Sequence, residues 1–162
     1  MDQQQRVLDL LDAMGIKYDI LRHRAAFTVK DMDELELDRY GYGVKNLFVR
    51  DSSGKRLFLI ALGKDKRADL KGIQKQLGCS RLSFASEESL FENLAITKGS
   101  VSPLAIINDA SRAVEMVMDQ DLKGKERLGL HPNDNTATLW ISFDALQRII
   151  ENSGHDIKFI NV

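Results

Sequence analysis

A lysine and an asparagine stand at the start of an apolar strand pattern in the run Val44-Lys45-Asn46-Leu47-Phe48-Val49-Arg50-Asp51. Successive side chains of a strand point to opposite faces, so Lys45 shares one face with Leu47 and Asn46 shares the other with Phe48. Both faces are largely apolar, which predicts a strand covered on both sides, where an ammonium and an amide must find partners or face a cavity. Lys45 is therefore a pocket candidate. The alternative is a lysine that extends along its own methylenes to reach water.

Two later segments also carry groups suited to a binding site. The loop from Thr97 to Pro103 is rich in small residues, so a ligand could approach its bare backbone N–H and C=O groups. An ordinary connection between a helix and a strand has the same composition, and this alternative stays open. His131 precedes a proline, which pushes its backbone to the extended region; its alternative role is a turn histidine bonded to the backbone.

The sequence offers little for a metal or a thiol nucleophile. Cys79 is the one cysteine and follows Gly78 at an expected helix end with no histidine nearby, which favours an unreactive thiol. The three histidines, His23, His131 and His155, are scattered and form no metal-ligand spacing. We expect no structural metal and no cofactor.

A set of strands and helices must position these groups. Turn-forming residues 51–55 separate the Lys45 strand from a second apolar run, 56–62, which predicts a hairpin. Further strands are expected at 16–21, 81–84, 104–107, 114–118, 137–141 and 156–162, with 104–107 paired to 114–118 across residues 108–112.

Helix signals lie between these strands. Asp2, the pair Thr28 and Asp31, and Ser142 are expected caps. The helices are expected at 2–14, 28–37, 69–77, 86–94, from 119 over a short stretch, and from 142 to about 150. Helices interleaved with hairpins predict an α+β fold, one domain spanning 1–162, with a mixed, mainly antiparallel, barrel-like sheet flanked by helices.

Composition and charge narrow the class of protein. The 162 residues with 43% apolar composition suffice for one ordinary core, and no window approaches the apolar length of a membrane span. The amino-terminal residues lack the features of a signal peptide, so we expect a cytoplasmic protein. Residues 54–82 hold eight Lys or Arg against two Asp, a net charge of +6 within a chain of net charge −1. Such a patch suits a short phosphate contact, although a solvated lysine-rich helix face has the same composition.

Several blocks of the chain, taken together and in order, resemble a known family. They are residues 44–51, 69–71, 81–84, 99–104, 107–109, 131–132 with 135–138, and 154–156. These blocks resemble the free-standing prolyl-tRNA editing proteins, which are similar to the editing insertion of bacterial prolyl-tRNA synthetases and to the YbaK-type deacylases. Within this family the chain is similar to the subgroup that hydrolyses alanyl-tRNA(Pro). One departure is the turn 130–135, which replaces a more aromatic and apolar version and alters the pocket edge.

The resemblance implies a trans-editing hydrolase that releases alanine and free tRNA(Pro). A synthetase pocket large enough for proline cannot exclude the smaller alanine, and a missing methylene gives only about 10- to 200-fold discrimination. A second, tighter site must then remove the error. The partners implied are the acceptor end of aminoacylated tRNA(Pro) and a prolyl-tRNA synthetase, with the protein acting as a monomer or weak dimer.

The resemblance also assigns roles to residues. The catalytic group is expected to comprise Lys45, Gly99, Ser102 and His131. Substrate-binding residues are expected to be Ile20, Phe27, Thr28, Val29, Asn46, Ser100, Val101, Pro103, Asn135 and Thr136. The positive charge of residues 54–82, and not the resemblance, predicts contacts to tRNA from Lys64, Lys66, Arg67, Lys71 and Lys75.

The expected chemistry is ester hydrolysis without an evident side-chain base. A lysine needs its pKa lowered by about three units to act as a base near pH 7, so Lys45 is expected to be a charged anchor. The resemblance suggests assistance by the neighbouring ribose hydroxyl. Two alternatives remain: a cysteinyl-tRNA(Pro) deacylase of the same fold, and a non-catalytic protein that senses tRNA or an amino acid.

Overall fold

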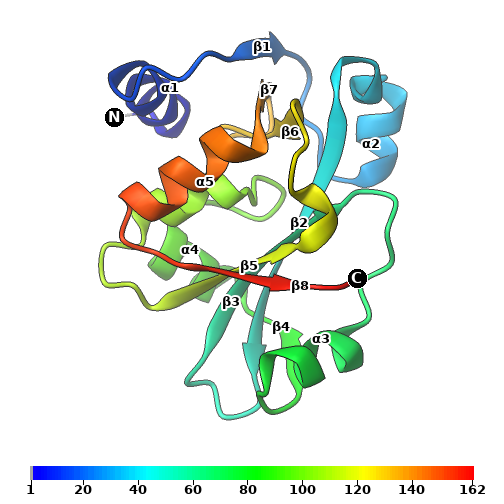
Figure 1. Cartoon of the computed structure of the whole chain (residues 1–162), viewed down its shortest axis with the longest axis vertical. Helices are drawn as coiled ribbons and strands as arrows, with labels where there is room; N and C mark the ends of the chain where they lie inside the picture. The colour runs from blue at the N-terminus through cyan, green and yellow to red at the C-terminus, as the bar shows by residue number, and fades with distance from the viewer. Residues whose placement is uncertain (1) are drawn as a thin grey trace.

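The structure is a computed structural model that describes residues 2–162. Met1, the first residue of the amino-terminal segment considered above, and the side chain of Asp38 lie outside the described part. One mixed sheet runs through the molecule, with helices on its faces and ends (Figure 1).

Eight strands form the sheet. They are β1 (Asp19–Arg22), β2 (Tyr42–Asp51), β3 (Leu57–Gly63), β4 (Leu82–Phe84), β5 (Val114–Asp119), β6 (Leu128–Leu130), β7 (Ala137–Ile141) and β8 (Ile157–Ile160). The order is β1-β7-β6-β2-β3-β5-β8, and β4 pairs with β2 beside this path. The pairs β2/β3, β2/β4, β6/β7 and β1/β7 are antiparallel, whereas β2/β6, β3/β5 and β5/β8 are parallel. The predicted α+β class and mixed sheet are confirmed, with an open sheet rather than a closed barrel.

Helices cover the sheet and connect its strands. They are α1 (Gln3–Ala13), α2 (Val29–Glu34), α3 (Leu70–Leu77), α4 (Glu87–Leu94) and α5 (Phe143–Asn152), with the 3₁₀ segments η1 (Leu37–Tyr40), η2 (Pro103–Asn108) and η3 (Gln120–Leu122). The predicted caps are confirmed, since Asp2, Thr28 and Ser142 each accept a hydrogen bond from a backbone N–H of the first helical turn. Figure 1 shows α2 beside the start of β2 and α3 next to β4, near the opposite end of the β2–β3 hairpin.

The predicted strand at 104–107 is wrong, because this segment is the 3₁₀ helix η2. Ser102 accepts a hydrogen bond from the backbone N–H of Leu104, and Pro103 follows at the first position, where a fixed φ and a missing N–H favour a helical start. The apolar run that suggested a strand is instead buried as a helical segment. Its expected partner β5 therefore pairs with β3 and β8.

Apolar clusters lie on both faces of the central hairpin, as the two-sided strand pattern predicts. Val44 and Phe48 belong to the larger cluster, which includes side chains of α1, α4, α5 and η2. Val49 lies in the smaller cluster under α3, and Leu47 packs against that cluster. Burial on both faces fixes the register of β2, because a slip by one residue would exchange every side chain between the faces.

Candidate active site

A cavity of about 640 Å³ opens beside the first half of β2. Its walls come from the segment leading into α2, from β2, from the β4–α4 region, from the loop after α4, and from the turn before β7. The lining residues are Ala26, Phe27, Thr28, Val29, Met32, Val44, Lys45, Asn46, Leu47, Phe48, Phe84, Ala85, Ser86, Glu87, Leu90, Lys98, Gly99, Val101 and His131. A volume of this size is typical of a ligand site.

Lys45 is half-buried and lines this cavity. Among the side chains that the structure describes, no carboxylate lies within ion-pair distance of its ammonium. Residues 44–49 of β2 carry no charge other than that of Lys45, so nothing on this part of the strand competes for the ammonium. The ammonium is thus available to an oxygen or a phosphate of a bound molecule.

Asn46 also lines the cavity and connects β2 to the loop after α4. Its Nδ2 donates a hydrogen bond of 3.3 Å to the carbonyl oxygen of Val101. That contact identifies the nitrogen end of the amide, because a carbonyl oxygen can only accept. The Oδ1 atom is buried and lacks a hydrogen-bond partner within the described residues. A buried acceptor without a partner is costly, so it marks a place where a ligand donor would be stabilising.

Gly99 brings the loop backbone to the cavity wall. Its φ of +91° lies in the left-handed region that favours glycine, and a Cβ added there would stand 2.7 Å from Cδ1 of Phe27. The phenyl ring therefore lies directly over the bare backbone of this residue. A side chain at position 99 would both strain the backbone and displace Phe27.

The start of α2 supplies the opposite wall with Phe27, Thr28 and Val29. Thr28 forms a reciprocal capping box with Asp31, and Asp31 also accepts a hydrogen bond from the backbone N–H of Phe27 at 2.9 Å. These bonds, with a further one from Arg24, lower the pKa of Asp31, the Phe27 contact being the largest cause. An ionised Asp31 thus fixes the three wall residues.

His131 lies on the remaining wall, and its ring is bonded to the backbone. Its Nδ1 lies 3.0 Å from the carbonyl oxygen of Ala137, so Nδ1 is the donor and Nε2 is the acceptor in the neutral ring. Burial lowers the pKa of His131, and repulsion from the His23 ring adds to this effect. The imidazole is therefore neutral at pH 7. The ring bond to Ala137 agrees with the turn role that the sequence left open as an alternative, and His131 also lines the cavity; its catalytic role stays a prediction.

Five of the predicted residues support the cavity from behind or lie beside it. Ser102 is fully buried and caps η2, while Ser100 and Pro103 are buried in the same segment outside the lining. The carbonyl oxygens of Asn135 and Thr136 accept hydrogen bonds from the backbone N–H groups of Ala26 and His23. These two bonds hold the segment before α2 against the turn before β7.

Ile20 lies on β1, outside the cavity lining, and packs against the larger core cluster. It pairs with Leu139 of β7 in the sheet. In this structure its side chain supports the sheet next to the site.

The five predicted tRNA contacts fall into two groups. Lys64 is buried and bonded to Asp33, and Lys66 pairs with Asp119 at 2.8 Å and with Asp121. These two carboxylates raise the pKa of Lys66 to about 12. The other three side chains, Arg67, Lys71 and Lys75, are exposed on and before α3.

Eleven cavity residues were not among the predicted site residues: Ala26, Met32, Val44, Leu47, Phe48, Phe84, Ala85, Ser86, Glu87, Leu90 and Lys98. Six of them, from Phe84 to Lys98, come from β4, α4 and the segments beside α4, which the sequence predicted as elements but could not place beside β2. The pairing of β4 with the far half of β2 brings them to the site. Only that pairing places α4 at the cavity, since no residue pattern in 85–94 points to a binding site.

The described residues offer neither a metal-binding cluster nor a membrane-spanning helix. No group of three or more His, Cys, Asp or Glu there is arranged to hold a metal ion. In the same residues, none of the helices has the length and apolar character needed to cross a bilayer.

Several known proteins resemble this protein in sequence or in fold. The protein is 39% identical over 162 residues to the prolyl-tRNA editing protein ProX of Acetoanaerobium sticklandii, with 100% of this chain and 99% of that protein covered. It is 31% identical over 157 residues to the prolyl-tRNA synthetase associated domain-containing protein 1 of Danio rerio, covering 96% of this chain and 85% of that protein.

A solved structure of a proposed trans-editing enzyme for prolyl tRNA synthetase superposes with a TM-score of 0.74 at 19% identity, covering 100% of this chain and 98% of that one. The structure of hypothetical protein APE2540 superposes with a TM-score of 0.72 at 20% identity, covering 95% of this chain and 97% of that one. At these identities the superpositions show a common fold.

The family described as the aminoacyl-tRNA editing domain matches residues 23–149, a span that holds every residue lining the cavity. With a family match over most of the chain and a relative aligned along its full length, this protein belongs to the aminoacyl-tRNA editing domain family.

Proposed function

We propose that this protein hydrolyses the ester of alanyl-tRNA(Pro), releasing alanine and free tRNA(Pro). The observation that carries the proposal is the position of Lys45, whose ammonium lines a cavity together with the backbone at Gly99. Membership of the editing family and the full-length likeness to a prolyl-tRNA editing protein support the choice of tRNA.

The first task of the site is to hold the ester carbonyl and the terminal nucleotide. Lys45 offers a positive charge from a half-buried position in the cavity wall, where an interaction with a carbonyl oxygen or phosphate is stronger than in water. Gly99 carries no side chain, so its backbone lines the cavity, and the Phe27 ring packed over it offers the ribose an apolar surface. Together they fix the reacting group relative to a water molecule.

The second task is to recognise an α-amino acid. The unpartnered Oδ1 of Asn46 is a buried acceptor at the cavity, and the ammonium of an aminoacyl ester is a charged donor. A hydrogen bond between them would satisfy the orphan oxygen and orient the aminoacyl group. In this proposal, Asn46 therefore binds the ammonium of the substrate.

The hydrolytic step needs a water and a proton acceptor. In the proposed step the water oxygen adds to the carbonyl carbon, the ester C–O bond breaks, and the ribose oxygen leaves with a proton. The neighbouring ribose hydroxyl assists by holding the water. His131 is neutral and keeps Nε2 as an acceptor, so it supports this arrangement by orienting the water or the hydroxyl.

The whole cavity exceeds the volume of an alanyl group, so it also has room for ribose and base. Discrimination against proline must then arise where the aminoacyl group itself is held. Met32, Val44 and Phe48 are apolar lining residues suited to a methyl group. Proline carries a ring where alanine has this methyl group.

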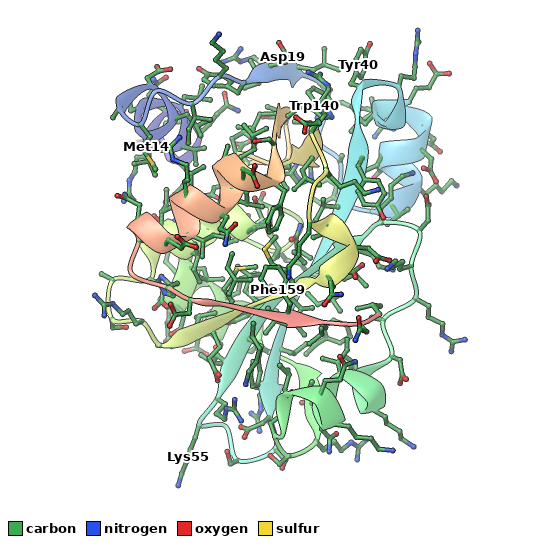
Figure 2. All side chains as sticks on the ribbon, viewed as in Figure 1. Met14, Asp19, Tyr40, Lys55, Trp140 and Phe159 are labelled. Atoms are coloured by element: carbon green, nitrogen blue, oxygen red, sulfur yellow. The ribbon has the colours of Figure 1, made fainter. Side chains whose placement is uncertain are left out.

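The test is deacylation of tRNA(Pro) charged with alanine, cysteine or proline, by the wild type and by Lys45→Ala. We expect alanyl-tRNA(Pro) to be the preferred substrate and Lys45→Ala to lose about 10²- to 10³-fold in kcat, since a group that stabilises developing charge contributes this much. Lys55→Ala is the matched control. Lys55 is exposed at the hairpin tip, far from α2, and Figure 2 shows it projecting from the molecule.

Each outcome separates the rival functions. Faster turnover of the cysteinyl ester would show that cysteinyl-tRNA(Pro), and not alanyl-tRNA(Pro), is the preferred substrate. Tight binding of charged tRNA without turnover would identify a sensing protein and refute the enzyme. Equal activity of Lys45→Ala and Lys55→Ala would show that Lys45 does not contribute to the reaction.

A further inference from the structure

Phe84 is an exposed aromatic residue at the edge of the cavity. It ends the short strand β4, has 66% of its surface exposed, and lines the cavity. Phe91, on α4, is exposed to a similar extent at 61% but lies outside the cavity lining. Exposure alone is common for single apolar residues, so the distinguishing feature of Phe84 is its position.

The sheet register places Phe84 on the face of β2 that carries Lys45. Phe84 lies opposite Val49 in the β2/β4 pair, and side chains of paired residues share a face. Lys45 and Val49 are four residues apart, which corresponds to about 13 Å along a strand. An alanyl group held at Lys45 cannot reach this ring, whereas the nucleotides attached to that group can.

The surroundings of Phe84 suit a nucleic-acid strand. Lys98 is an exposed cation on the cavity wall. Glu87 also lines the cavity, but its carboxylate lies 3.8 Å from the Lys98 ammonium, which offsets its charge. The exposed basic residues of α3 lie nearby, because α3 packs against β4.

We propose that Phe84 is a positioning residue whose ring stacks on a base of the unpaired 3′ end of the tRNA while the aminoacyl group occupies the inner cavity. The proposal rests on the function proposed above. Every base has a flat face, so an aromatic platform holds an unpaired strand without reading its sequence. Phe27 is the other exposed phenylalanine of the cavity. Its ring packs over Gly99, so Phe84 is the better candidate for stacking on a base.

The kinetic test compares Phe84→Leu, Phe84→Trp and Phe91→Leu on alanyl-tRNA(Pro). Leucine keeps an apolar side chain but lacks a stacking face, whereas tryptophan keeps one. We expect Phe84→Leu to raise KM roughly 5- to 150-fold with a smaller change in kcat, the range expected for the loss of one base stack. Phe84→Trp should restore KM, and Phe91→Leu should match the wild type. Equal effects of Phe84→Leu and Phe91→Leu would overturn the proposal.

A binding test keeps the proposal independent of turnover. The probe is an uncharged RNA stem-loop with the acceptor stem of tRNA(Pro) and 2-aminopurine as its 3′-terminal base. Stacking should quench the fluorescence of this base on binding to the wild type and to Phe84→Trp, and much less with Phe84→Leu. If the wild type quenches the probe but deacylates no charged tRNA, the function fails and the stacking role survives. If all variants quench equally, the stacking role fails whatever the activity.

Discussion

Single residues of this site act through charge and protonation that the surrounding chain imposes. The proposed role of Lys45 as a charged anchor depends on its surroundings, since no carboxylate among the described side chains lies within ion-pair distance of its ammonium. His131 owes its neutrality to burial and to the nearby His23 ring, and its tautomer to the carbonyl of Ala137. Neither property belongs to the residue type alone.

The lowered pKa of His131 predicts a pH-dependent contribution to stability. The unfolded chain binds the proton first as pH falls, because its histidine keeps the ordinary pKa of about 6.5. The stabilising contribution is therefore present above pH 6.5 and is lost as pH falls through the lower pKa of the folded protein. Each unit of lowering corresponds to about 1.4 kcal/mol.

His131→Asn tests this linkage, because the amide can still donate to Ala137 but does not titrate. We expect urea unfolding to show the wild type losing free energy of unfolding relative to His131→Asn between pH 7.5 and pH 5. The other two histidines are common to both proteins, so their titration cancels in the difference. A difference that is flat with pH would show that His131 keeps an ordinary pKa.

At the scale of elements, the cavity depends on how α2 and the loop after α4 meet. The capping box of Thr28 and Asp31 sets the start of α2, and the Phe27 ring then covers Gly99. Asn46 ties the same loop to β2 through Val101. Three elements are thus joined at one point of the wall.

Gly99→Ala should disrupt this point. The added Cβ meets the Phe27 ring and the backbone keeps a positive φ, so we expect a loss of about 1 to 3 kcal/mol in stability and at least about tenfold in activity. Gly54→Ala is the matched control, since its φ is +71° with nothing within 4 Å of the added Cβ. It should share the backbone strain and keep the activity per folded molecule. Equal activity losses in both variants would mean that the packing of Phe27 on Gly99 is unimportant.

Local patterns predicted most elements correctly and failed where tertiary context decides. The hairpin β2–β3 follows from alternating apolar residues around a polar turn, and helix starts follow from Asp2, Thr28 and Ser142. The segment Leu104–Ile107 has the composition of a strand, but the Ser102 cap and Pro103 begin a 3₁₀ helix there. An apolar run of this length is ambiguous until its neighbours are known.

At the scale of the molecule, the sequence identified parts of the site without assembling them. Lys45, Asn46 and the loop at Gly99 were expected from residue types and from the family resemblance, and all line the cavity. The wall from β4 and α4 was not expected, because the pairing of β4 with β2 leaves no local signal. The surface charge was predicted as a patch, but Lys64 and Lys66 within it are engaged by carboxylates.

The exposed part of the patch predicts a salt-dependent interaction with tRNA. Replacing Arg67, Lys71 and Lys75 by alanine should weaken tRNA binding and reduce the slope of log K against log salt by about 0.7 to 0.9 for each phosphate that is no longer neutralised. Lys64 and Lys66 stay intact in this variant, so that the buried Asp119 keeps its partner. The measurement is affinity for tRNA(Pro) at several salt concentrations.

The control removes the same charge elsewhere, with Lys17, Lys55 and Lys158 replaced by alanine. All three are exposed and lie before β1, at the hairpin tip and on β8. This variant should weaken binding only slightly, through net charge. Equal slopes for the two triple variants would leave the α3 patch without a specific role.

The strand pairing has a consequence for the protein's own synthesis. A ribosome that has reached residue 101 has already made Lys45, Asn46 and Gly99, but His131 and strand β7, which holds the segment before α2 in place, are still to come. A nascent chain of this length therefore carries an incomplete set of walls. The cavity is complete only after the turn before β7 has been made.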